Sequence, residues 1–158
     1  MARDISSEDI VPEIQSNIYS RDYSEKSLIN GIKIVALKTF VSEDGDFGEI
    51  IRLNSRAKLK RIPGFTVAQI NRTTLLPGSV KAWHLHLKQN EIWFVVPSGH
   101  VLVGLWDVRK NSPTSGKTMR VVLGGGQSSL LFIPKGVAHG SLNLSHKSVE
   151  LFYFVDRQ

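Results

Sequence analysis

Two histidines and a glutamate in the middle of the chain are spaced so that two adjacent strands could bring their side chains together. His84 and His86 alternate along an extended segment, so both imidazoles would lie on one face, and Glu91 follows after a short turn. A fourth group, His139, comes after the turn-forming residues 134–136. Imidazole and carboxylate together can ligate Fe, Mn, Ni, Zn or Cu. The spacing therefore predicts either a divalent metal site or a polar pocket without metal.

The segments around these residues have the composition of strands. From Gly31 onward, short stretches rich in β-branched and aromatic residues alternate with Pro-Gly, Ser-Gly and Gly-Gly turns. Strands are predicted over residues 32–37, 65–70 and 91–96, and no long helix is predicted. This pattern is typical of an all-β sandwich or barrel whose strands are joined by hairpins.

The organisation of the chain is simple. Its 158 residues are expected to form one domain, because 41% hydrophobic residues suffice for a single core. Residues 1–30 are predicted to be a polar extension in which residues 6–9 cap a short helix through Ile14, and residues 31–158 are predicted to be the barrel domain. We expect the extension to order on a partner subunit of a homodimer.

Charge is distributed unevenly along the chain, although the formal total is +6. Residues 1–50 hold ten acidic and five basic residues, whereas residues 51–158 hold four acidic and fifteen basic ones. The cationic body predicts an anionic ligand. Nucleic acid is not favoured, because Lys and Arg form no long consecutive block, and the densest stretch, residues 56–61, is typical of a solvated loop.

The composition also indicates where the protein works. No apolar run approaches the roughly 20 residues that span a bilayer. The first residues lead into acidic and Ser-rich sequence rather than an apolar signal core. The absence of cysteine excludes disulfides, thiolate zinc sites and a cysteine nucleophile. We therefore expect a cytoplasmic protein with no membrane partner.

Two segments resemble the sequence motifs of the cupin superfamily. Residues 78–99 match the pattern G-x5-H-x-H-x4-E with the closing glycine one residue late, and residues 134–143 match P-x-G-x2-H-x3-N. Cupins are small jelly-roll β-barrels, also described as double-stranded β-helices. The resemblance implies an all-β fold of this type and one divalent metal ligated by His84, His86, Glu91 and His139.

A longer resemblance, over residues 32–156, is to the dTDP-4-dehydrorhamnose 3,5-epimerase family. The family's D-x-R-x-x-S-P-T-x-G run is present at residues 107–116, its I-P-x-G-x-A-H-G run at 133–140 and its E-x-x-Y strand at 150–153. Members are dimeric cupin-fold enzymes that act on nucleotide-linked 4-keto-6-deoxy sugars. The resemblance implies the same reaction, which needs a base beside the ketone and an acid on the opposite face of the sugar.

The resemblance also assigns roles to individual residues. His84 falls on the family's catalytic base, and Tyr153 falls on the acid of the opposite face. Lysine stands at position 81, where the family commonly has arginine, and Lys88 would reach the pocket from a loop. Contacts with the sugar or the diphosphate are expected from Gln69, Asn71, Lys81, Lys88 and His139.

This sequence departs from the family at the lysine that stabilises the enolate oxygen, where it has Glu91. Two residues after the catalytic histidine it has His86 in place of glutamine. Because these exchanges add two metal ligands, we hypothesise that a divalent cation held by His84, His86, Glu91 and His139 replaces the lysine. A metal-bound His84 would have no free lone pair, and another group would then have to be the base.

Two other functions stay open from the sequence. One is a metal-dependent cupin of another class, either a dioxygenase or a non-nucleotide sugar isomerase. It is favoured by His86, by Glu91 and by Asp46, which replaces the family's phosphate-binding arginine. The other is a non-catalytic sugar-binding cupin. It is favoured by the missing lysine and by the lack of the family's C-terminal aspartate among the five residues after Tyr153.

Overall fold

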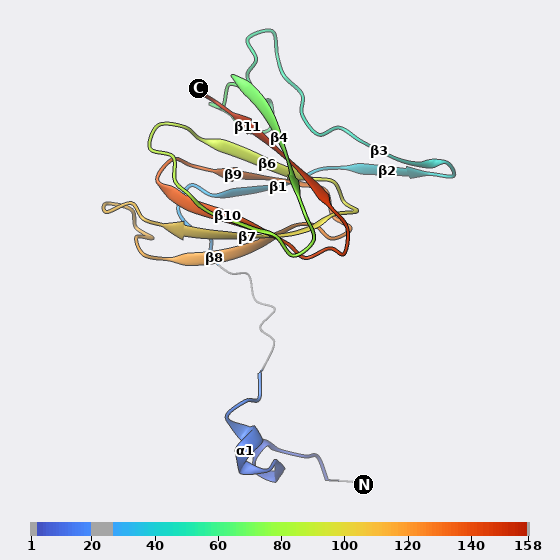
Figure 1. The fold of residues 1–158 in the computed structure, drawn as a ribbon, viewed down its shortest axis with the longest axis vertical. Helices are drawn as coiled ribbons and strands as arrows, with labels where there is room; N and C mark the ends of the chain where they lie inside the picture. The colour runs from blue at the N-terminus through green and yellow to red at the C-terminus, as the bar shows by residue number, and fades with distance from the viewer. Residues whose placement is uncertain (1–2, 20–26, 158) are drawn as a thin grey trace.

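The computed structural model of the protein describes residues 3–19 and 27–157. Two antiparallel sheets face each other as a flattened barrel (Figure 1). The five-stranded sheet has the order β1-β9-β6-β11-β4, and the four-stranded sheet has the order β5-β10-β7-β8. The strands of the first sheet are β1 Lys33–Ala36, β9 Ser129–Ile133, β6 Glu91–Val95, β11 Val149–Val155 and β4 Gln69–Leu75. Those of the second are β5 Val80–His84, β10 Val137–Asn143, β7 His100–Asp107 and β8 Thr118–Gly124.

The main core lies between the two sheets and follows from the alternation of side chains along each strand. In β7, Val101, Val103 and Leu105 point inward and are buried, while the residues between them face outward. From the opposite sheet, Val95 of β6 and Leu131 of β9 join the same cluster. This core occupies the interior of the barrel, so the predicted all-β barrel is confirmed.

A second core covers the outer face of the five-stranded sheet. Leu59, Ile62 and Phe65, from the long segment before β4, pack against Ile92 and Phe94 of β6. As a result every residue of β6 is buried, on both faces of the sheet. Such a strand has a nearly continuous apolar sequence instead of an alternating one.

The predicted strand over residues 65–70 is wrong for residues 65–68, because β4 begins only at Gln69. Phe65 and Val67 instead pair with the preceding loop: the amide of Leu59 donates to the carbonyl of Phe65, and the amide of Val67 donates to that of Ala57. These contacts hold the segment over the second core. A β-rich composition alone does not distinguish such a loop from a strand.

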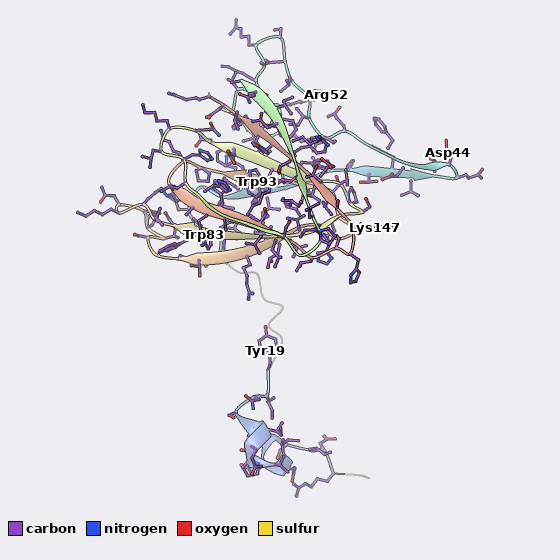
Figure 2. The ribbon with its side chains drawn as sticks, viewed as in Figure 1. Tyr19, Asp44, Arg52, Trp83, Trp93 and Lys147 are labelled. Atoms are coloured by element: carbon purple, nitrogen blue, oxygen red, sulfur yellow. The ribbon has the colours of Figure 1, made fainter. Side chains whose placement is uncertain are left out.

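Two peripheral segments leave apolar side chains uncovered. The hairpin of β2 (Thr39–Ser42) and β3 (Gly45–Gly48) extends from the barrel, with Asp44 at its tip (Figure 2). Every residue of both strands is exposed, including Phe40, Val41 and Phe47. An isolated two-stranded hairpin has little stability of its own in water. The hairpin is therefore a candidate contact surface.

The N-terminal segment contains a short 3-10 helix, Ser7–Asp9, and a short α-helix, α1, Pro12–Gln15. The predicted capped helix is thus present as two separate turns, and the amide of Ser6 donates to the Asp9 carboxylate at 2.9 Å. Figure 1 shows this segment away from the barrel, and its apolar residues Val11 and Ile14 are exposed. In the described part of the chain, no helix is long and apolar enough to cross a membrane.

Candidate active site

A pocket opens at one end of the barrel, between the two sheets, with a volume of about 250 Å³. Trp93 belongs both to the pocket lining and to the core cluster that fills the space between the sheets. Strands β4, β6 and β11 form one wall, and β5 and β10 form the other. The lining residues are Thr73, Lys81, His84, His86, Gln89, Glu91, Trp93, His139, Ser141, Leu151 and Tyr153.

Glu91 is the centre of the polar network in this pocket, although it is only 4% exposed. Its Oε1 atom accepts a hydrogen bond from Gln89 at 2.8 Å and lies 3.0 Å from Nε2 of His86. Its Oε2 atom accepts from the indole N–H of Trp93 at 2.7 Å and lies 3.4 Å from Nε2 of His139. Each carboxylate oxygen therefore has two partners.

These partners keep Glu91 ionised. Burial alone raises the pKa of a carboxyl group, because it disfavours the charged form. The hydrogen bonds from His139 and Trp93, together with the charges of His139 and His86, outweigh burial and hold the pKa of Glu91 below its ordinary value. The pocket thus contains a buried carboxylate anion at neutral pH.

His139 has a defined tautomer in this network. Its Nδ1 atom lies 3.0 Å from the carbonyl oxygen of Val137, which can only accept, so Nδ1 carries a proton. In a neutral ring, Nε2 would then present its lone pair to the Glu91 carboxylate. The Nε2 lone pair of His139 and the carboxylate oxygen of Glu91 are both acceptors and lie only 3.4 Å apart, so they would repel each other. This distance requires either a second proton on the ring or a cation between the two atoms. The pair therefore fits an imidazolium bound to a carboxylate, and it also fits two ligands of one metal ion.

The ligand atoms of His86, Glu91 and His139 lie within 4.8 Å of one another, so these three predicted ligands come together. His84 is not part of this group. It lies opposite His139 in the strand register, and the two rings are 6.2 Å apart. A metal held by the three-residue group would therefore leave His84 free, and the conflict between metal binding and the base role does not arise.

His86 reaches this group by a different route from the predicted one. β5 ends at His84, so the prediction that both histidines lie on one strand is wrong for His86. Its carbonyl accepts instead from the amide of Gly136, in the turn before β10, at 2.8 Å. This bond ties the loop after β5 to the turn that leads to His139.

Some of the other predicted site residues line the pocket and others lie outside it. Tyr153 lines the pocket from β11 and lies opposite Trp93 and Asn71 in the strand registers. Gln69 and Asn71 hydrogen-bond to each other and share the inward face of β4 with Thr73, but they lie beyond the pocket lining. Lys88 is exposed on the loop before β6 and does not line the pocket.

Five lining residues are not among the predicted site residues: Thr73, Gln89, Trp93, Ser141 and Leu151. A signal existed for Trp93 and Ser141, because each lies two residues from a predicted ligand on the same strand and so faces the same side. The place of Thr73 and Leu151 in the pocket could be predicted only from the pairing of β4 with β11, and this pairing cannot be read from the sequence.

The S-P-T run, residues 112–114, takes part in a hydrogen-bond network centred on Asp107. The buried Asp107 carboxylate accepts from Nε of Arg109 at 2.8 Å and from the hydroxyls of Ser112 and Thr114. The Arg109 side chain lies against Gly136, where a Cβ would approach its Cγ to 2.5 Å. Asp107 and its partners therefore hold the turn from which β10 carries His139 into the pocket.

A jelly-roll barrel with a histidine-rich pocket between its sheets defines a cupin-type protein. The family model for dTDP-4-dehydrorhamnose 3,5-epimerase matches residues 26–158, and the chain belongs to that family. The predicted family and fold are thereby confirmed. This membership favours a sugar epimerase over the other cupin functions that the sequence left open.

Similar proteins agree with this assignment. The chain is 35% identical over 127 residues to the spore coat polysaccharide biosynthesis protein SpsL of Bacillus subtilis, covering 80% of each chain. It resembles the dTDP-4-dehydrorhamnose 3,5-epimerase of Sulfolobus tokodaii, with a TM-score of 0.69, 33% identity and coverage of 84% and 74%. A Legionella pneumophila epimerase, solved with dTDP-4-keto-L-rhamnose, gives a TM-score of 0.71, 28% identity and coverage of 84% and 70%.

Proposed function

We propose that this protein epimerises a dTDP-linked 4-keto-6-deoxy sugar by removing and replacing protons on carbons next to the ketone. One observation carries the proposal: His84 and Tyr153 line the same pocket from opposite sheets. A sugar ring bound between the sheets would present one face to each side chain. Inversion at carbon requires this arrangement, because the proton must leave from one face and return to the other.

The reaction can be written with these two groups. The imidazole of His84 accepts the proton from carbon, and the electron pair of the C–H bond moves into the carbonyl, which becomes an enolate. The phenol of Tyr153 then donates a proton to the opposite face of the same carbon, and the ketone reforms. Exchange with solvent returns His84 and Tyr153 to their starting protonation states.

Substrate contacts extend from the pocket to its rim. Lys81 and His139, which line the pocket, would contact the sugar. Gln69 and Asn71 continue the inward face of β4 beyond the pocket and would contact the part of the substrate outside it. Lys88 lies on an exposed loop outside the pocket, and it would contact the diphosphate at that loop. The excess of basic residues after residue 50 is consistent with an anionic diphosphate. We also propose that the protein is located in the cytoplasm.

The proposal is tested by incubating the protein with dTDP-4-keto-6-deoxyglucose in D2O. Deuterium is expected at the carbons flanking the ketone, together with a product of inverted configuration, both followed by NMR. The protein is assayed as purified, after dialysis against chelator, and with added divalent metal. Absence of exchange under all three conditions would remove the epimerase from consideration.

A metal at the His86, Glu91 and His139 group is a second candidate property of the pocket. The Nδ1 bond of His139 to a backbone carbonyl is an arrangement common among metal-ligating histidines. A bound divalent cation would supply a Lewis acid near the substrate carbonyl. For this candidate, we expect close to one equivalent of divalent metal in protein purified without chelator, and its loss in Glu91→Gln.

Metal analysis by mass spectrometry, with Glu150→Gln as the matched control, checks this prediction. Glu150 is a carboxylate paired with Arg72 on the outer face of the sheet, so its replacement should leave the metal content unchanged. Less than about a tenth of an equivalent in the wild-type protein, with no gain in exchange when metal is added, contradicts the metal site.

We also propose that the protein is a homodimer in which the N-terminal segment contacts the partner. The support is the exposure of Val11 and Ile14, and the acidic charge of this segment, which complements a cationic barrel. The double variant Val11→Asp/Ile14→Asp is expected to shift sedimentation equilibrium toward monomer. Glu13→Gln, on the same helix, is the control and should remain dimeric. An unchanged mass for the double variant contradicts this interface.

A further inference from the structure

The reaction proposed above creates negative charge on an oxygen, and the pocket must stabilise it. An enolate oxygen needs hydrogen-bond donors or a cation positioned before the charge develops. Glu91 cannot serve, since it is itself an anion and both its oxygens are occupied. Among the described residues that line the pocket, Lys81 alone carries a fixed positive charge.

We propose that the ammonium group of Lys81 binds the enolate oxygen and is a catalytic residue, in addition to any contact with the diphosphate. This inference rests on the proposed function, because it assigns the electrophile of that same reaction. The proton leaves carbon for His84, the electron pair moves to oxygen, and Lys81 donates a hydrogen bond to that oxygen. No proton transfer from Lys81 is required.

A β-bulge places Lys81 beside His84. On a regular strand, residues three apart point to opposite faces, so Lys81 and His84 would not share the pocket. In β5, however, Lys81 lies opposite Ser141 and His84 lies opposite His139. A step of three residues along β5 is therefore paired with a step of two residues along β10. The extra residue reverses the alternation, and both side chains reach the pocket.

The strand next to the bulge is adapted to it. Gly140 lies between His139 and Ser141 on β10, and a Cβ there would approach the Cβ of Ala82 to 2.5 Å. Glycine at this position therefore lets β5 come close enough for the bulge to pack. The arrangement that turns Lys81 inward is thus built into both strands.

The ammonium group is also held in place from the opposite sheet. Nζ of Lys81 donates to the hydroxyl oxygen of Thr73 on β4 at 2.6 Å, which leaves two of its three N–H groups for a ligand. Within residues 3–19 and 27–157, no carboxylate forms a salt bridge with this ammonium group. Its charge is therefore available to an anion in the pocket.

The test compares Lys81→Met with Lys147→Met in the D2O exchange assay. Lys147 is an exposed lysine remote from the pocket (Figure 2), so its variant should behave like the wild type. Lys81→Met is expected to lower kcat for exchange by about 100-fold or more, with KM changed by less than about threefold. Propylamine should restore part of the rate to Lys81→Ala, which a purely structural role would not allow.

The outcomes separate this inference from the function on which it rests. No exchange by the wild-type protein overturns both. Exchange by the wild type together with an unchanged kcat for Lys81→Met overturns only the role of Lys81. A large rise in KM at constant kcat also overturns it, because that result assigns Lys81 to binding of the diphosphate alone.

Discussion

Replacing His84 by alanine is expected to lower deuterium exchange into the 4-keto sugar by about a thousandfold, because general-base catalysis contributes effects of this size. The reason is the position of His84, which lines the pocket but stands apart from the group formed by His86, Glu91 and His139. Among the described residues no carboxylate forms a salt bridge with its ring, so the imidazole is placed to act on the substrate. The loss should be the same with and without added metal.

His100→Ala is the matched control, since His100 is an exposed histidine at the start of β7, outside the pocket. It should retain the wild-type exchange rate. Both variants should melt near the wild-type temperature, because both side chains are exposed. If His84→Ala keeps more than about a tenth of the wild-type rate, His84 is not the base.

Tyr153→Phe provides a contrast within the same assay. Proton removal by His84 does not need the phenol, so exchange should persist in this variant. Inversion should fall strongly, because the acid on the opposite face is missing. Equal loss of exchange and inversion would argue against separate roles for the two side chains.

The second large effect is expected on stability, from Asp107→Ala. This carboxylate is fully buried and accepts hydrogen bonds from Arg109, Ser112 and Thr114. Removing one partner of a buried ion pair leaves the other charge and its donors unsatisfied, at a cost of about 3 kcal/mol or more. For a protein of this size, that corresponds to a fall in Tm of roughly 6–12 °C, measured by calorimetry.

The pH dependence of this effect has a definite sign. Hydrogen bonds from Arg109 hold the pKa of Asp107 far below its ordinary value; burial opposes them, while Ser112 and Thr114 add to them. A carboxyl group with a lowered pKa in the folded state contributes stability above the pKa of the unfolded chain, about 4, and loses it as the pH falls further. The stability difference between wild type and Asp107→Asn should therefore shrink between about pH 4 and pH 2.

Asp44→Asn is the control for this experiment. Asp44 lies at the exposed tip of the β2–β3 hairpin, where it accepts from the hydroxyl of Ser42. Its replacement should change the free energy of unfolding by less than about 0.5 kcal/mol. If Asp107→Ala melts within about 2 °C of the wild type, the Asp107 network does not support the barrel as described.

The parts of the fold that could be predicted from the sequence are those set by local pattern. Alternating and β-branched segments with Gly and Pro turns located β1 and β6. The same pattern failed at residues 65–68, where the backbone pairs with a neighbouring loop and Phe65 packs into the second core. That choice depends on contacts with β6 and β9, which composition does not encode.

The site could be predicted to a similar extent. Histidine and glutamate spacing predicted four candidate ligands, and the structure brings the ligand atoms of three of them, His86, Glu91 and His139, within 4.8 Å of one another. Glu91 starts a strand and His139 follows a turn, as the spacing indicated. The separate position of His84 and the inward direction of Lys81 were not predictable from spacing. The inward direction of Lys81 depends on the bulge in β5, which packs closely against Gly140 of β10.

The two walls of the pocket belong to different sheets, and the side chains of the barrel core pack between those sheets. Leu105 of β7 and Leu131 of β9 are packed in that core, away from the pocket lining. A smaller side chain at either position would let the sheets approach, and the separation between the His84 and Tyr153 side chains would change. The stereochemical fidelity of the enzyme, measured as inversions per exchange event, would then depend on residues that never contact the sugar.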